Sequence, residues 1–180
     1  MEEITSATSD LLLADWFRRV RESQHMHYDA SHYFSRLHYY LGIPTMILTS
    51  LVGTAVFASL DKQSVGDIKI LVGLVSILAS VLATLQTFLG LSERAERHRV
   101  TAASYSAIRR QLEMIKTFQP EEKEKLIQTL TDIRDQMDSL AKSSPEVPQK
   151  IRDRTYIELK RNEHKRVFHI LEAGQGSKKQ

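Results

Sequence analysis

The chain contains no cysteine, and it also lacks the short motifs that mark common catalytic sites. Without cysteine it can form no disulfide, no thiolate metal site and no cysteine nucleophile. A glycine-rich phosphate loop, a G-x-S-x-G turn and an H-E-x-x-H zinc motif are also missing from the 180 residues. We therefore expect neither an enzyme nor a bound cofactor.

Charge is absent from two long stretches, residues 41–60 and 70–91, which contain no Asp, Glu, Lys, Arg or His. A helix of about 20 mostly apolar residues crosses a hydrocarbon core of roughly 30 Å, and each stretch is long enough. The alternative is a pair of core helices in a soluble bundle, but such helices normally keep a polar face. The abrupt return of charge at both ends favours two transmembrane helices.

A short polar segment, residues 61–69, connects the two stretches and makes the spans antiparallel neighbours, with Gly66 available for a positive φ. Lys and Arg near the membrane set the orientation of such a hairpin. The connection holds only Lys62 and Lys69, whereas more arginines lie on the other side of the spans: Arg21 and Arg36 before the first, and Arg94, Arg97, Arg99, Arg109 and Arg110 after the second. We therefore expect an inner (plasma) membrane protein with both termini in the cytoplasm.

Stripes of apolar residues at helical spacing flank the spans, so the predicted fold class is all-α. We expect an integral membrane helical hairpin with long cytoplasmic helical extensions, assembled as an oligomer. Four parts follow along the chain: an N-terminal juxtamembrane helix (1–40), the two-transmembrane hairpin (41–91), a cytoplasmic helical hairpin (92–142), and a linker, basic C-terminal helix and tail (143–180).

The first helix, over residues 8–41, begins at Thr8 or Ser9 as its cap and runs into the first span through a kink at Pro44. The second span continues as a helix to residue 118, which pairs antiparallel with a helix over residues 121–142. The positions expected to be buried on these three helices are Leu13, Phe17, Val20, Gln24, His27, Ser31, Phe34, His38 and Leu41; His98, Thr101, Tyr105, Ile108, Leu112 and Ile115; and Leu126, Leu130, Ile133, Met137 and Leu140.

Small and hydroxyl-bearing residues gather along one side of each span, and we call them the hydroxyl band. They are Thr45, Thr49, Ser50, Gly53 and Thr54 on the first span and Gly73, Ser76, Ser80, Thr84 and Thr87 on the second. Helix packing accounts for such residues, because they let backbones approach and hydrogen bond across a seam. A lone hairpin needs one seam, however, so the two sides favour an oligomer in which the band forms the seam between copies or lines a poorly selective pore.

A dense run of charge, residues 93–99, follows the second span directly. It reads as a solvated helix start whose arginines contact anionic lipids. The functional alternative is a charged cytoplasmic vestibule below a pore. Its members would be Arg94, Arg97, His98 and Arg99.

Two further clusters of polar residues suggest a metal site and a nucleic acid or nucleotide site, and neither function is favoured. His25, Asp29 and His32 share a helix face that can hold a divalent ion, but histidines near a membrane more often pack or contact lipid phosphates, so no metal is expected. The last helix, over residues 149–172, is rich in Lys and Arg, with Ile157, Phe168 and Leu171 on its apolar side. Acidic residues interrupt its basic run and no aromatics interleave with it. A solvated face is therefore favoured over nucleic acid or nucleotide binding.

The chain resembles the SLATT family, a two-transmembrane effector domain found beside nucleotide second-messenger and SLOG-type genes in prokaryotic conflict systems. The resemblance spans about residues 10–145. It rests on Trp16, on residues 27–33, on Leu41-Gly42-Ile43-Pro44 with Gly53-Thr54, and on the run 93–99 followed by Tyr105, Arg110 and Glu113.

This resemblance implies an anti-phage effector that oligomerises in the inner membrane and permeabilises it on a signal from a partner that makes or senses a second messenger. Growth arrest or cell death would follow. Two alternatives stay open: a non-conducting, membrane-anchored scaffold for a cytoplasmic partner, and a sensor that binds a nucleotide directly at its basic helices.

Overall fold

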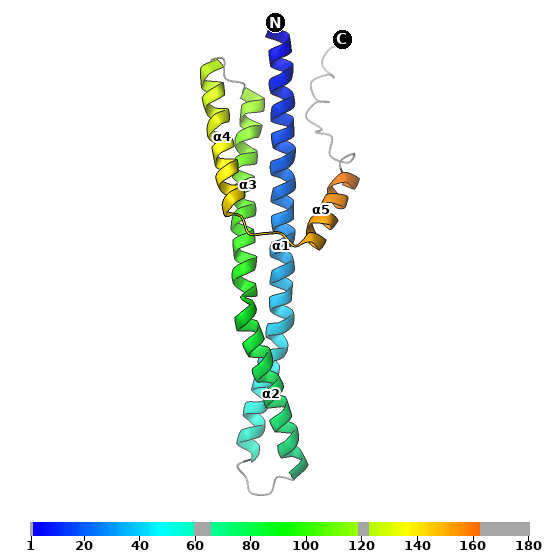
Figure 1. The fold of residues 1–180 in the computed structure, drawn as a ribbon. Helices are drawn as coiled ribbons and strands as arrows, with labels where there is room; N and C mark the ends of the chain where they lie inside the picture. The colour runs from blue at the N-terminus through cyan, green and yellow to red at the C-terminus, as the bar shows by residue number, and fades with distance from the viewer. Residues whose placement is uncertain (1, 60–65, 119–122, 163–180) are drawn as a thin grey trace, which may run out of the picture. The chain divides into compact units, whose positions relative to one another are not determined.

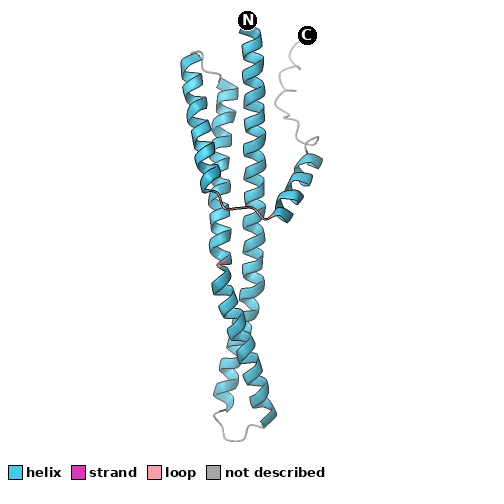
Figure 2. Cartoon of the chain, viewed as in Figure 1, coloured by secondary structure: helices cyan, strands magenta, loops and turns pink. Residues whose placement is uncertain are grey.

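The computed structural model describes the backbone of residues 2–59, 66–118 and 123–162, and the side chains within 11–56, 69–118 and 124–161. In this part the chain forms five helices (Figure 1): α1 (Glu2–Ser59), α2 (Gly66–Leu89), α3 (Leu91–Phe118), α4 (Lys123–Ser143) and α5 (Gln149–Asn162). No strand occurs among the described residues (Figure 2), which confirms the all-α class.

Helix α1 unites the predicted juxtamembrane helix and the first span, and it continues through Pro44. The predicted start at Thr8 or Ser9 is wrong, because α1 begins at Glu2. The residues between Glu2 and Thr8 include no glycine or proline to stop a helix, so a polar residue suited to capping does not by itself set the boundary.

Gly90 separates α2 from α3, whereas the sequence predicted one uninterrupted helix there. Its φ is +53°, a left-handed conformation that glycine adopts at little cost. The Arg94 N–H donates to the Gly90 carbonyl at 3.0 Å, so α3 begins immediately beyond the break. Gly66, for which the sequence analysis allowed a positive φ, is instead the first residue of α2.

The chain divides into two units, Met1–Asp29 with Val100–Gln180, and Ala30–Arg99. In the first unit, α1, α3 and α4 enclose an apolar cluster that Trp16 and Phe17 also contact. The buried members of that cluster are Leu13, Val20, Tyr105, Ile108, Leu112, Ile115 and Ile133. All of them lie on the predicted stripes, which confirms the periodicity of three helices. The His27 ring stacks on Tyr105 with centroids 5.7 Å apart, filling the α1–α3 contact with aromatic surface.

The second unit is an antiparallel helical pair made by the later part of α1 and by α2 with the start of α3. At one end of its seam the Phe34 and His98 rings stack, with centroids 5.4 Å apart and planes 14° apart. Farther along, Gly42 lies against the Gln86 amide, since a Cβ on Gly42 would be 3.1 Å from Gln86 Nε2. Buried small residues complete the seam: Ala30, Ser31, Thr45, Ala79 and Ala95.

Outside this seam the helical pair exposes its apolar side chains. Only 11% of the most apolar window within Leu11–Val56, and 6% of that within Lys69–Phe118, is buried. Met46 is 70% exposed, Leu74 60% and Phe88 84%. Two helices are therefore long and apolar enough to span a membrane, and the described part of the chain leaves most of their apolar surface exposed.

Helix α5 does not bury Ile157, the one described residue of the three that the sequence placed on its apolar side. Ile151 and Thr155 of α5 are buried, as is Val147 just before the helix, whereas Ile157 is 65% exposed. Thr155 Oγ1 donates a hydrogen bond of 2.5 Å to Asp29 Oδ2, so the side of α5 that holds Thr155 lies against α1. Phe168 and Leu171, also assigned to the apolar side, lie outside the described residues.

Candidate functional site

The hydroxyl band is split between the inside and the outside of the helical pair. Thr45 is buried in the seam, and Gly53 and Ser76 are half-buried. The remaining members are exposed on the single chain: Thr49, Ser50 and Thr54 on α1, and Gly73, Ser80, Thr84 and Thr87 on α2. One hairpin therefore uses only part of its small and hydroxyl-bearing surface for its own packing.

Nearly all hydroxyls of the band donate to the carbonyl one turn earlier in their own helix. Thr45 Oγ1 donates to the Leu41 carbonyl at 2.7 Å, and Ser76 Oγ donates to the Val72 carbonyl at the same distance. The same bond, at 2.8 to 3.1 Å, is made by Thr49, Ser50, Thr54, Thr84 and Thr87. Such bonds satisfy the hydroxyl hydrogen without a partner helix and leave the oxygen able to accept from water or a neighbour.

Ser80 is the exception within the band. Its side chain is exposed and makes no hydrogen bond with any described residue, while its carbonyl accepts from Thr84. Together with Val81, Leu85 and Phe88 these two residues line a shallow hollow of about 410 Å³ on α2. The hydroxyl of Ser80 is therefore the member of the band most open to an external partner.

Ion pairs within α3 organise the charged run that follows Gly90. Arg97 bonds Glu93 at 2.6 Å and Arg99 bonds Glu96 at 2.7 Å, and all four side chains are more than half exposed. Hydrogen bonding from Arg99 lowers the pKa of the Glu96 carboxyl below its usual value. Arg94 forms no ion pair with a described residue, so it contributes an uncompensated charge at the helix start.

His98 does not lie with these arginines. Its ring is buried in the seam on Phe34, in agreement with its predicted stripe position and in conflict with its predicted place in an exposed vestibule. Burial lowers the pKa of the imidazole, because desolvation disfavours the charged form. In the single chain, the vestibule surface is reduced to Arg94, Arg97 and Arg99.

The candidate metal ligands do not converge. Within the described ranges, no three His, Asp or Glu side chains gather closely enough to hold an ion. Asp29, the carboxylate of the weighed trio, accepts the hydrogen bond from Thr155.

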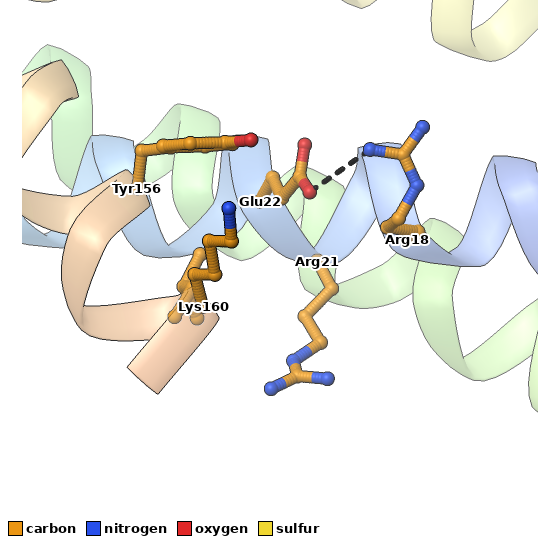
Figure 3. A pocket seen from close by; sticks show the side chains of 6 residues that line it. Arg18, Arg21, Glu22, Tyr156 and Lys160 are labelled. Atoms are coloured by element: carbon orange, nitrogen blue, oxygen red, sulfur yellow. Dashed lines mark hydrogen bonds and ion pairs between the residues drawn. The ribbon is translucent and has the colours of Figure 1, made fainter. Parts of the chain in front are cut away.

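The structure contains a cleft between α1 and α5 that the sequence did not predict (Figure 3). It is lined by Arg18, Arg21 and Glu22 of α1 and by Tyr156, Leu159 and Lys160 of α5. The basic composition of the last helix was visible in the sequence. The α1 residues that face α5 are more than a hundred residues away from it in the chain, so no local sequence pattern indicates this contact.

No family model, curated protein or solved structure matches this chain.

Proposed function

We propose that the chain is a membrane effector that inserts residues 41–91 as a helical hairpin, assembles with copies of itself and permeabilises the inner membrane. The observation that carries the proposal is the surface of the second unit: apolar side chains exposed almost all round, with a hydroxyl band on one part of it. In water this apolar area would be costly, at about 25 cal/mol per Å². In hydrocarbon the same side chains are at low cost and the backbone is already hydrogen bonded within helices.

Assembly through the hydroxyl band is supported by the small residues that a single hairpin does not use for its own packing. Gly53 and Gly73 have no atom within 4 Å of where a Cβ would lie, so neither glycine is needed for close packing in the single chain. In membranes, small residues support close approach between helices, and a second hairpin supplies the missing partner. A ring of such hairpins would place the exposed hydroxyls of α1 and α2 at the subunit seam or toward a central path.

The trigger and biological role in this proposal come from the resemblance to the SLATT family. The effector would stay inactive until a partner that makes or senses a second messenger signals phage infection, and opening would arrest growth or kill the cell. Both termini would face the cytoplasm, where unit Met1–Asp29 with Val100–Gln180 would receive the signal.

Substitution of Ser80 tests the working surface of this proposed effector. Ser80→Leu fills the shallow hollow on α2 with an apolar side chain, so we expect loss of toxicity and of membrane depolarisation while membrane insertion is retained. A voltage-sensitive dye in induced bacteria, with the neighbouring genes and phage supplied, measures depolarisation, and membrane fractionation measures insertion.

Two variants control for size and position. Ser80→Ala keeps the site small, and Leu78→Phe adds bulk to an exposed apolar residue outside the band; both should depolarise as the wild type does. If Ser80→Leu kills as effectively as the wild type, the band on α2 is not the working surface.

The second candidate is a membrane-anchored scaffold that conducts nothing. The intrahelical hydrogen bonds of the band favour it, because hydroxyls already satisfied in their own helix need neither water nor a partner. Absence of depolarisation under every condition, with the protein bound to a cytoplasmic partner, would support the scaffold over the effector. Direct nucleotide sensing, the third alternative, is addressed by titrating nucleotides against the purified chain.

A further inference from the structure

The cleft between α1 and α5 is built by antiparallel contact of the two helices. Thr155 of α5 bonds Asp29 of α1, and the next turn of α5 brings Tyr156 and Lys160 beside Arg18 and Glu22. Later residues of α5 therefore lie beside earlier residues of α1, as in an antiparallel helix pair. Since Val147, Ile151 and Thr155 are buried, the position of the cleft is set by packed residues rather than by its own charged side chains.

The lining of this cleft carries a net positive charge, with three cations and one carboxylate. The carboxylate is already engaged: Arg18 donates to Glu22 at 3.1 Å and to Asp15 at 2.7 Å. Arg21 and Lys160 form no ion pair with any described residue. A cation in the last turn of α5 suits the helix dipole, but the dipole gives no reason for Arg21 on the facing helix.

Volume decides which kind of anion fits. The cleft holds about 140 Å³, below the roughly 300–1,000 Å³ of sites that enclose an organic ligand. It can accept a phosphate group but not a whole nucleotide. The available donors match that group, because ammonium, guanidinium and phenol N–H and O–H groups form charge-assisted hydrogen bonds with phosphate oxygens.

We propose that this cleft binds a phosphate group and that the bound group fastens α5 to α1. Lys160 and the Tyr156 hydroxyl, which face Glu22 in Figure 3, donate to the phosphate oxygens from α5. Arg18 donates from α1 through the guanidinium N–H groups that its ion pairs leave available. Arg21, whose guanidinium points away from Glu22 in the same view, turns toward the bound anion.

Binding across two helices couples the ligand to the position of α5. The cleft begins at Tyr156, the residue after Thr155, whose hydroxyl bonds Asp29, so the ligand would add a second polar contact between α5 and α1. An anion that contacts both helices stabilises the docked state by its binding free energy. The phosphate belongs either to a soluble molecule or to a lipid headgroup, and the experiment distinguishes these sources.

The first measurement is titration of the full-length protein in nonionic detergent with inorganic phosphate, at ionic strength held constant with chloride. We expect saturable binding and slower amide hydrogen exchange in α5. Arg21→Gln and Lys160→Gln should each weaken binding roughly tenfold or more, because each removes a charged hydrogen bond. Lys150→Gln, an exposed lysine of α5 outside the cleft, should bind phosphate as the wild type does.

Neutralising Glu22 should have the opposite effect on phosphate binding. Glu22→Gln removes the only carboxylate of the lining, so phosphate should bind several-fold more tightly, whereas a purely structural role for Glu22 predicts unchanged or weaker binding. Equal affinity of the wild type, Arg21→Gln and Lys160→Gln, or no saturable binding in any of them, would overturn the proposal.

Nanodiscs identify the source of the phosphate. In discs of phosphatidylcholine alone, free phosphate should bind as in detergent. If phosphatidic acid in the disc competes with it, the group belongs to a lipid headgroup; if phosphatidic acid has no effect, it belongs to a soluble molecule. Both results support a phosphate site. All residues of the cleft belong to the first unit, whereas the proposed assembly in the membrane uses the second. The absence of a phosphate site would therefore not contradict the membrane effector, and a non-conducting protein would not contradict the phosphate site.

Discussion

Single residues decide how closely the two spans approach. Gly42 is buried against the Gln86 amide, whereas Gly53, in the same helix, has open space where a Cβ would lie. The two glycines look alike in the sequence, each within a span and near hydroxyl-bearing residues. Only one of them is required by the packing of the single chain.

Leucine substitution separates the two glycines. Gly42→Leu forces Gln86 and α2 away and should destabilise the helical pair by about 1–3 kcal/mol, as overpacking does. Gly53→Leu should leave it unchanged. Unfolding of the purified protein in dilute detergent, where chains are separate, measures both, and equal stability of the two variants would contradict the seam described here.

His98 gives the protein a pH dependence. Its pKa in the folded chain lies below the ordinary 6.5 because the ring is buried. Between the folded and unfolded pKa values the unfolded chain binds more protons, so stability rises with pH. The full stability is present above pH 6.5 and falls as the pH drops below that value toward the folded pKa.

The melting temperature should therefore decrease on acidification below pH 6.5, and His98→Phe, which keeps an aromatic ring on Phe34, should flatten that decrease. His32→Phe alters an exposed ring and should retain the wild-type slope. A His98→Phe protein with an unchanged slope would assign the acid sensitivity to another group.

At the scale of the elements, α5 is a short helix with a small described contact on α1. Its buried side chains are Ile151 and Thr155, and a hydrogen bond between the side chains of Thr155 and Asp29 joins it to α1. Elements with few buried contacts open at low free energy. A ligand that contacts both α5 and α1 can therefore shift the position of α5.

Removal of the Thr155 hydroxyl tests this attachment. Thr155→Val leaves the Asp29 carboxylate without its donor and should cost about 1.5–3 kcal/mol of docking free energy, so amide exchange in α5 should accelerate more than in α3. Thr129→Val on α4 is the control, because Thr129 is exposed and donates only to its own backbone. Equal exchange rates in the two variants would show that α5 is held by its apolar contacts alone.

At the scale of the molecule, the chain combines a unit that has an apolar core with a helical pair that exposes its apolar side chains. The first unit buries Leu112 and Ile133 among α1, α3 and α4. The second buries mainly small residues and aromatic rings along one seam. This difference in buried surface is the physical basis for the proposal that the helical pair inserts into a membrane and the first unit does not.

Arginine at matched positions tests that assignment. Leu74→Arg places a charge on the exposed apolar surface of α2 and should cost about 3 kcal/mol of insertion free energy. A larger share of the protein should then appear in the soluble or degraded fractions. Met114→Arg substitutes an equally exposed apolar residue of α3 and should leave membrane association unchanged; equal behaviour of both variants would contradict insertion of α2.

The amino-acid sequence alone determined the helices and their buried sides where the pattern repeats locally. Charge-free stretches located the two long apolar helices, and the spacing of Val20, Tyr105 and Ile133 identified sides that are buried in the structure. These features depend on helical periodicity, which residues three and four apart already express.

The tertiary structure decided what depends on residues far apart in the chain. It placed His98 against Phe34, buried Thr45 while leaving Ser80 exposed, and rotated α5 so that Thr155 rather than Ile157 faces α1. It also turned Gly90 into a break between helices. Each outcome depends on which partner occupies the neighbouring space, and that is fixed by packing between helices rather than by the periodicity within one.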